Sequence, residues 1–185
     1  MIYILVCFLT IFISSKADLM YENITGVSAI AQYHYLVVGY TILCACVFAY
    51  KTKKVYHYLY SYKPWIDHLI ILTAMIMSFG SFFRYTINGQ DLSSMIHVYC
   101  SMIPSLIFLI LLFVYNRYLL YQFPKIYARI HWYYEYSVYF LGILLVVFTR
   151  VNGYIEILFA IVVSSYLYII EKEMKTVLAQ KSSNQ

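Results

Sequence analysis

The sequence predicts an all-α protein, a polytopic membrane helix bundle, and three observations support this class. Residues 35–50, 69–83, 98–115, 136–149 and 157–170 contain no Asp, Glu, Lys, Arg or His. Basic or aromatic residues lie at or near the ends of these stretches, as is typical of bilayer-crossing helices. Only 11% of the 185 residues are charged, whereas soluble domains carry about 25%. Lipid can cover such an apolar surface, and a soluble fold of this size could not.

Residues 2–13 form a shorter apolar run that would span a bilayer only with difficulty. Small residues follow it, with Ser15 and Ala17 at the positions that a signal peptidase recognises. We therefore interpret residues 1–17 as a signal peptide cleaved after Ala17. No Lys or Arg precedes the run, which leaves an uncleaved first helix with a cytosolic N-terminus as the alternative. Both interpretations place residues 18–32 in the lumen.

Asn23-Ile24-Thr25 has the form of an N-glycosylation acceptor. Asn23 is therefore the candidate glycosylation site of the luminal segment. The triplet lies close to the next membrane span, which would hinder the transferase.

The remainder, residues 18–185, is expected to be a single transmembrane domain of five helices. With interfacial residues included, the spans are about 33–50, 65–83, 97–115, 132–149 and 153–170. Asn88-Gly89 and Asn152-Gly153 supply turns between successive spans. Residues 171–185 form a short cytosolic tail, and its mixed charges favour a helix that continues beyond the membrane.

The basic residues predict the orientation. With residue 18 in the lumen, ten Lys and Arg residues collect on the cytosolic side and two on the luminal side. The cytosolic set is Lys51, Lys53, Lys54, Lys63, Arg117, Lys125, Arg129, Lys172, Lys175 and Lys181, and the luminal set is Arg84 and Arg150. The pattern indicates an integral protein of a secretory-pathway membrane (endoplasmic reticulum, plasma membrane or viral envelope) with a luminal N-terminus and a cytosolic C-terminus.

Tyrosine is unusually frequent, with 23 copies. Many of these residues, including Tyr56, Tyr115 and Tyr134, lie near predicted membrane boundaries. Tyr favours the headgroup layer, where its ring is in apolar surroundings and its hydroxyl meets water. We interpret these tyrosines as two interfacial belts.

The apolar stretches contain no ionisable group, which argues against a proton relay or a charged selectivity ring. No metal-ligand spacing or phosphate loop is present, so no cofactor and no nucleic-acid partner are expected. Charged residues gather at the cytosolic edge. Asp67, His68, His131 and Glu135 could form an acid–base site for lipid headgroups if they converge there. The basic loop Lys51, Lys53 and Lys54 is either an anionic-lipid contact or only a topology determinant.

The leading hypothesis is a non-enzymatic multi-pass protein that contacts another membrane protein, or itself, in an assembly, trafficking or accessory role. The segment 117–135 and the tail are its first candidate contacts. One alternative is a receptor-like or truncated seven-helix module with a luminal ligand cavity between the second, third and fifth spans. Asn116-Arg117-Tyr118 resembles the Asp/Glu-Arg-Tyr end of helix three in rhodopsin-like receptors, although two helices are missing. The other alternative is the headgroup-modifying enzyme.

Overall fold

The computed structural model describes residues 1–86 and 89–183, with side chains through residue 179. Asn88 of the predicted Asn88-Gly89 turn lies outside these residues. The described part contains helices and no strand, which confirms the all-α class. The elements are α1 (Ile2–Ser14), α2 (Ile24–Ala29), η1 (Ala31–Tyr33), α3 (His34–Tyr56), α4 (Trp65–Ser81), α5 (Leu92–Gln122), α6 (Pro124–Phe148) and α7 (Gly153–Ser183).

Each of the five predicted spans falls on one of the helices α3 to α7. Among the described residues, four helical stretches are long and apolar enough to cross a membrane: Ala31–Tyr56, Leu92–Gln122, Pro124–Phe148 and Gly153–Ala179. Helix α4 is apolar but has 17 residues, which extend about 26 Å against a hydrocarbon core of about 30 Å. The chain is an integral membrane protein, and the crossing by α4 stays a prediction.

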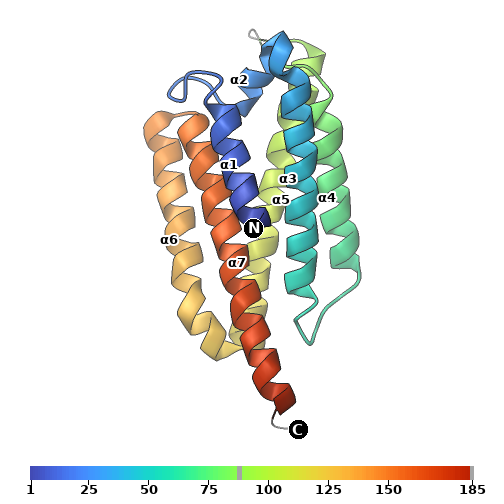
Figure 1. The fold of residues 1–185 in the computed structure, drawn as a ribbon, viewed down its shortest axis with the longest axis vertical. Coiled ribbons are helices and arrows are strands. Elements are labelled where there is room, and N and C mark those ends of the chain that lie inside the picture. Colours follow the sequence, from blue (N-terminus) through green and yellow to red (C-terminus); the bar gives the residue numbers. More distant parts are fainter. Residues whose placement is uncertain (87–88, 184–185) are drawn as a thin grey trace.

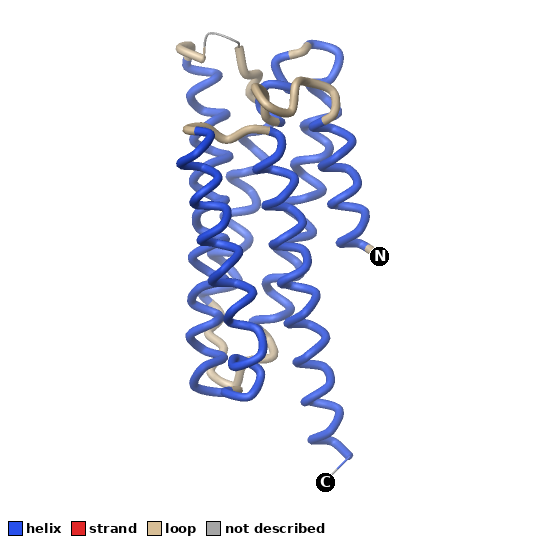
Figure 2. Tube along the Cα trace, turned by 90° about the vertical axis from the view of Figure 1, so that its left-hand side faces the viewer, coloured by secondary structure: helices blue, strands red, loops and turns tan. Residues whose placement is uncertain are grey.

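The helices run side by side along the long axis of the molecule (Figures 1 and 2). Helices α6 and α4 lie at opposite edges of the bundle, and α7 extends past it toward the C-terminus (Figure 1). We call the end covered by α2 the α2 end, and the end where α3 carries Lys51, Lys53 and Lys54 the basic end. At the basic end the predicted connection 117–135 is almost entirely helical, because α5 reaches Gln122 and α6 begins at Pro124. Pro is well suited to a first helical position.

Helix α1 packs into the bundle against α7 and α3. Its Val6 clusters with Cys44 and Val47 of α3, and its Ile13 clusters with Val27 and Val37. The Thr10 and Tyr40 hydroxyls are hydrogen-bonded at 2.8 Å. Cleavage after Ala17 stays a prediction. If it occurs, it uncovers this side of α3.

Residues 18–33 cover the α2 end and are bonded to the start of α7. The Ile24 N–H donates to the Glu156 carboxylate at 2.6 Å, and the Gly153 N–H donates to the Glu22 carbonyl at 2.8 Å. Arg150 lies over the Tyr21 ring at 5.0 Å. Arg150 and Glu156 flank the α6–α7 turn and could have paired across it, but each contacts this covering segment instead.

Capping side chains begin the helices at the α2 end. The Asn152 Oδ1 accepts a hydrogen bond from the Ile155 N–H at 3.1 Å, close to the start of α7. Asp91 precedes α5, and its carboxylate accepts bonds from the Ser94 hydroxyl at 2.7 Å and from the Thr86 hydroxyl. These two bonds, Ser94 first, lower the pKa of Asp91 to about 2.

Four tyrosines meet in the core near the basic end, where α3, α5, α6 and α7 come together. Tyr56, Tyr115, Tyr134 and Tyr166 are all buried. The Tyr56 and Tyr134 hydroxyls donate to the Leu111 and Leu109 carbonyls at 2.5 and 2.9 Å, and the Tyr166 hydroxyl donates to the Asn116 Oδ1 at 2.5 Å. The belt interpretation is therefore wrong for Tyr56, Tyr115 and Tyr134. It fits Tyr35, Tyr50 and Tyr121, which are exposed.

Helices α4 and α5 approach closely where Gly80 faces Cys100. A Cβ atom built on Gly80 would collide with the Cys100 Cβ and lie 3.3 Å from its Cα, whereas one built on Gly142 of α6 would meet nothing within 4 Å.

We expect Gly80→Ala to lower the stability of the bundle by about 1–3 kcal/mol, because it forces α4 away from α5. Gly142→Ala is the matched control and should leave stability unchanged or slightly raised, since Ala favours a helix over Gly. The melting temperature of the detergent-purified protein measures both. Equal melting temperatures for the two variants would contradict the close contact.

Candidate functional site

The three lysines of the predicted basic loop lie on the last turns of α3 and are paired with carboxylates. Glu171 of α7 is 7% exposed. It accepts Lys51 at 2.9 Å, Lys54 at 2.8 Å and Lys175 at 3.0 Å. The Tyr3 hydroxyl of α1 adds a bond to the same carboxylate at 3.3 Å. We call these five residues the Glu171 cluster, and it connects α1, α3 and α7 at the basic end.

Lys53, the third lysine of the basic segment, contacts α4. Its ammonium lies 2.8 Å from the Asp67 carboxylate, which also accepts the His57 Nε2 at 3.1 Å. Asp67 is thus part of a connection between α3 and α4. All three lysines pair with carboxylates on neighbouring helices. The main role of the basic segment is therefore to connect helices, and contact with lipid is secondary.

The four residues of the enzyme hypothesis do not converge. Asp67 and His68 are on α4, whereas His131 and Glu135 are on α6, at the opposite edge of the bundle (Figure 1). The His131 Nδ1 is hydrogen-bonded to the Tyr127 carbonyl of the same helix at 2.8 Å. No hydrogen bond or ion pair within the described chain joins the α4 pair to the α6 pair. The arrangement required for acid–base chemistry is absent from these four residues.

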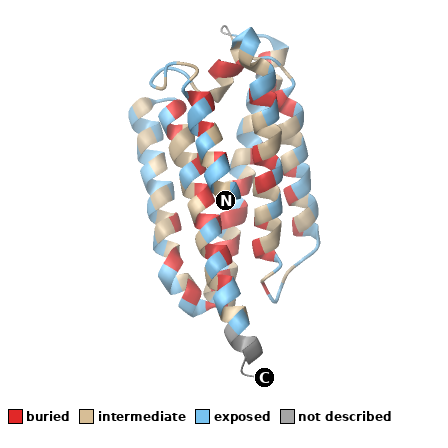
Figure 3. Ribbon diagram, viewed as in Figure 1, coloured by how far each residue is buried: buried red, intermediate tan, exposed pale blue. Residues whose placement is uncertain are grey.

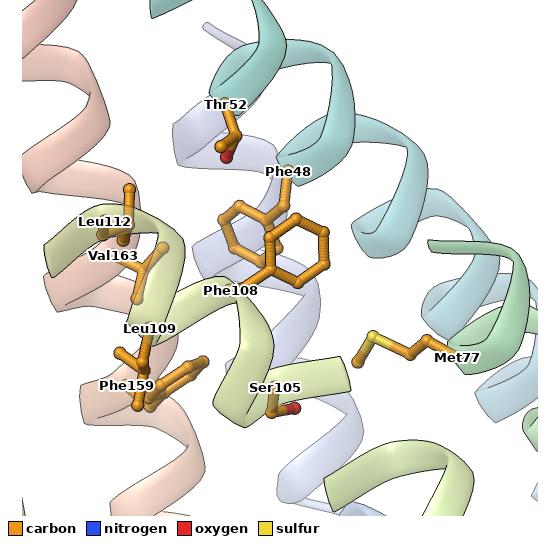
Figure 4. Close-up of a pocket in the computed structure, with 9 residues that line it drawn as sticks. All are labelled: Phe48, Thr52, Met77, Ser105, Phe108, Leu109, Leu112, Phe159 and Val163. Carbon is orange, nitrogen blue, oxygen red and sulfur yellow. The ribbon is translucent and has the colours of Figure 1, made fainter. Parts of the chain in front are cut away.

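A small cavity lies among α3, α4, α5 and α7 (Figure 4). Its volume is about 40 Å³, far below the roughly 300–1,000 Å³ of ligand pockets. Its lining is Phe48, Thr52, Met77, Ser105, Phe108, Leu109, Leu112, Phe159 and Val163. None of these residues belongs to α2 or to the loops at the α2 end. The cavity therefore does not provide the luminal ligand site of the receptor hypothesis.

Asn23, the glycosylation candidate, caps α2. Its Oδ1 accepts a hydrogen bond from the Gly26 N–H at 2.9 Å, and the residue is half-buried. Use of this acceptor stays a prediction. No group of three or more His, Cys, Asp or Glu residues in the described chain could hold a metal ion.

Helix α6 is the least covered of the long helices. Its buried residues are Ile126, Ile130 and Tyr134, all in the half nearer the basic end, and the other half is exposed or half-exposed throughout (Figure 3). The opposite side of the helix carries Trp132, Glu135, Tyr136 and Tyr139, which we call the outer face of α6. The Trp132 and Tyr136 rings stack at 5.4 Å. The outer face is the strongest candidate for a contact surface.

No protein-family model, no curated protein and no solved structure matches this chain.

We expect Glu171→Gln to destabilise the protein by about 2 kcal/mol, because Lys51 and Lys54 lose a charged acceptor at a site shielded from water. Glu173→Gln is the matched control. Glu173 has one exposed ion pair, with Arg129, and such pairs contribute about 0–1 kcal/mol. Unfolding in mixed detergent measures both changes. Equal losses for the two variants would show that the Glu171 cluster does not connect the helices.

Proposed function

We propose that this membrane protein acts without chemistry of its own, in an assembly, trafficking or accessory role, by holding another membrane protein through helix and loop contacts. The uncovered outer face of α6 is the observation that carries the proposal. In this arrangement the basic end faces the cytosol of a secretory-pathway membrane, and residues 18–32 face the lumen.

The distribution of polar contacts supports a contact role over the alternatives. Carboxylates at the basic end are largely used to connect helices, as Glu171 and Asp67 illustrate. The candidate acid–base residues are divided between two distant helices, and the cavity is too small for a ligand. The outer face of α6 presents large aromatic groups and one carboxylate to its surroundings.

A photo-crosslinking residue tests the proposal when placed in the full chain in its native membrane. At Tyr139, which is 65% exposed on α6, we expect a discrete adduct with one integral membrane protein. At Met75, which is 63% exposed on α4, we expect lipid adducts alone. The Tyr139 adduct should be competed by excess unlabelled protein. Lipid adducts alone at both positions would contradict the proposed function.

A further inference from the structure

Glu135 is an unpaired carboxylate on the outer face of α6. No hydrogen bond or ion pair within the described residues reaches it. The nearest basic groups on the same helix are already engaged: Arg129 pairs with Glu173 at 2.9 Å, and His131 bonds the Tyr127 carbonyl. The other carboxylates at this end, Asp67, Glu171 and Glu173, each have a basic partner.

One contact and one sequence prediction indicate that Glu135 lies inside the cytosolic edge. It is three residues, about one helical turn, into the predicted span 132–149. Its neighbour Tyr134 also donates to the Leu109 carbonyl, and Leu109 is six residues, about 9 Å, from the end of the apolar stretch 98–115. An ionisable side chain at such a depth is costly unless it has a partner, and it is retained mainly where it has a role.

Aromatic residues flank this carboxylate along the helix. Trp132 and Tyr139, three residues before it and four after it, lie beside it on the helix surface, and the Tyr136 ring stacks on Trp132. Trp and Tyr faces attract cations, most strongly where water is excluded. A carboxylate with flanking aromatic rings is complementary to the guanidinium of Arg or the ammonium of Lys.

We infer that the outer face of α6 binds a transmembrane helix that carries one Arg or Lys about a turn inside the cytosolic edge. The inference deepens the proposed function and rests on it, because it names the chemistry of the partner. A second copy of this chain is a poorer occupant. A two-fold contact through α6 would bring the two Glu135 carboxylates together, and like charges repel.

The test uses the full chain in phosphatidylcholine vesicles, with a donor fluorophore at the C-terminus. The probes are two synthetic polyleucine transmembrane peptides with an acceptor fluorophore, one with a single Arg at the depth of Glu135 and one without. We expect the Arg peptide to bind about tenfold more tightly than the leucine peptide. Glu135→Gln should remove this preference, and the matched control Glu173→Gln should keep it.

A second variant separates binding from folding. Trp132→Leu keeps an apolar contact and should weaken binding of the Arg peptide several-fold, with the leucine peptide unaffected. Equal binding of the two peptides to the unmodified chain would overturn the inference. A preference for the Arg peptide that survives Glu135→Gln would also overturn it. So would energy transfer between donor-labelled and acceptor-labelled copies of this chain that is lost in Glu135→Gln, because it would show self-association through this face. The Arg preference could also appear in phosphatidylglycerol vesicles and be absent in phosphatidylcholine. That result would mean that the cationic choline headgroup occupies the outer face, and it too would overturn the inference.

The outcomes distinguish the inference from the proposed function. A protein adduct at Tyr139 together with equal peptide binding would leave the contact role standing and reject only the cationic partner. If no protein adduct forms at Tyr139 but the Arg peptide is preferred, the outer face binds a cation as inferred, and the proposed contact with a membrane protein in the native membrane is rejected.

Discussion

The absence of water from the hydrocarbon core is the constraint on which this structure depends. Each buried polar group must find its partner within the protein. Much of this requirement is met by charged pairs between helices and by buried hydroxyls that bond across helices. The buried tyrosines Tyr56, Tyr134 and Tyr166 donate to carbonyl or amide oxygens of α5. Aromatic side chains thus supply apolar packing and connections between helices at the same time.

The two ends of the bundle are connected by different means. At the basic end, ion pairs connect the helices. Glu171 of α7 pairs with Lys51 and Lys54 of α3, and Asp67 of α4 pairs with Lys53 of α3. At the α2 end the connections are mostly backbone hydrogen bonds and caps, as between Gly153 and Glu22. Helix α6 takes little part in either set beyond the Arg129–Glu173 pair, and Trp132, Tyr136 and Tyr139 of its outer face stay exposed.

Charge-free apolar stretches and their length were sufficient to predict helices α3 to α7, because a membrane span is a local property of the sequence. Pairing between helices was not predictable, since it depends on rotation and register. Nothing in the run of 51–54 indicates that its lysines meet Glu171 across 117 or more residues. Tyr115 was assigned to an interface because it ends an apolar stretch, yet α5 continues to Gln122 and Tyr115 is buried in the core. The outer face of α6 became visible only when the buried side of that helix was known.

We predict that every helix from α3 to α7 crosses the bilayer, including α4 with its 17 residues. Lys63 precedes α4 and Gln90 follows it, and both are exposed. They can be replaced singly by Cys in a chain without its native cysteines. A membrane-impermeant thiol reagent applied to sealed vesicles then reports the side of each position. We predict that Lys63→Cys reacts only from the cytosolic side and Gln90→Cys only from the luminal side. Reaction of both from the same side would contradict the five-helix arrangement.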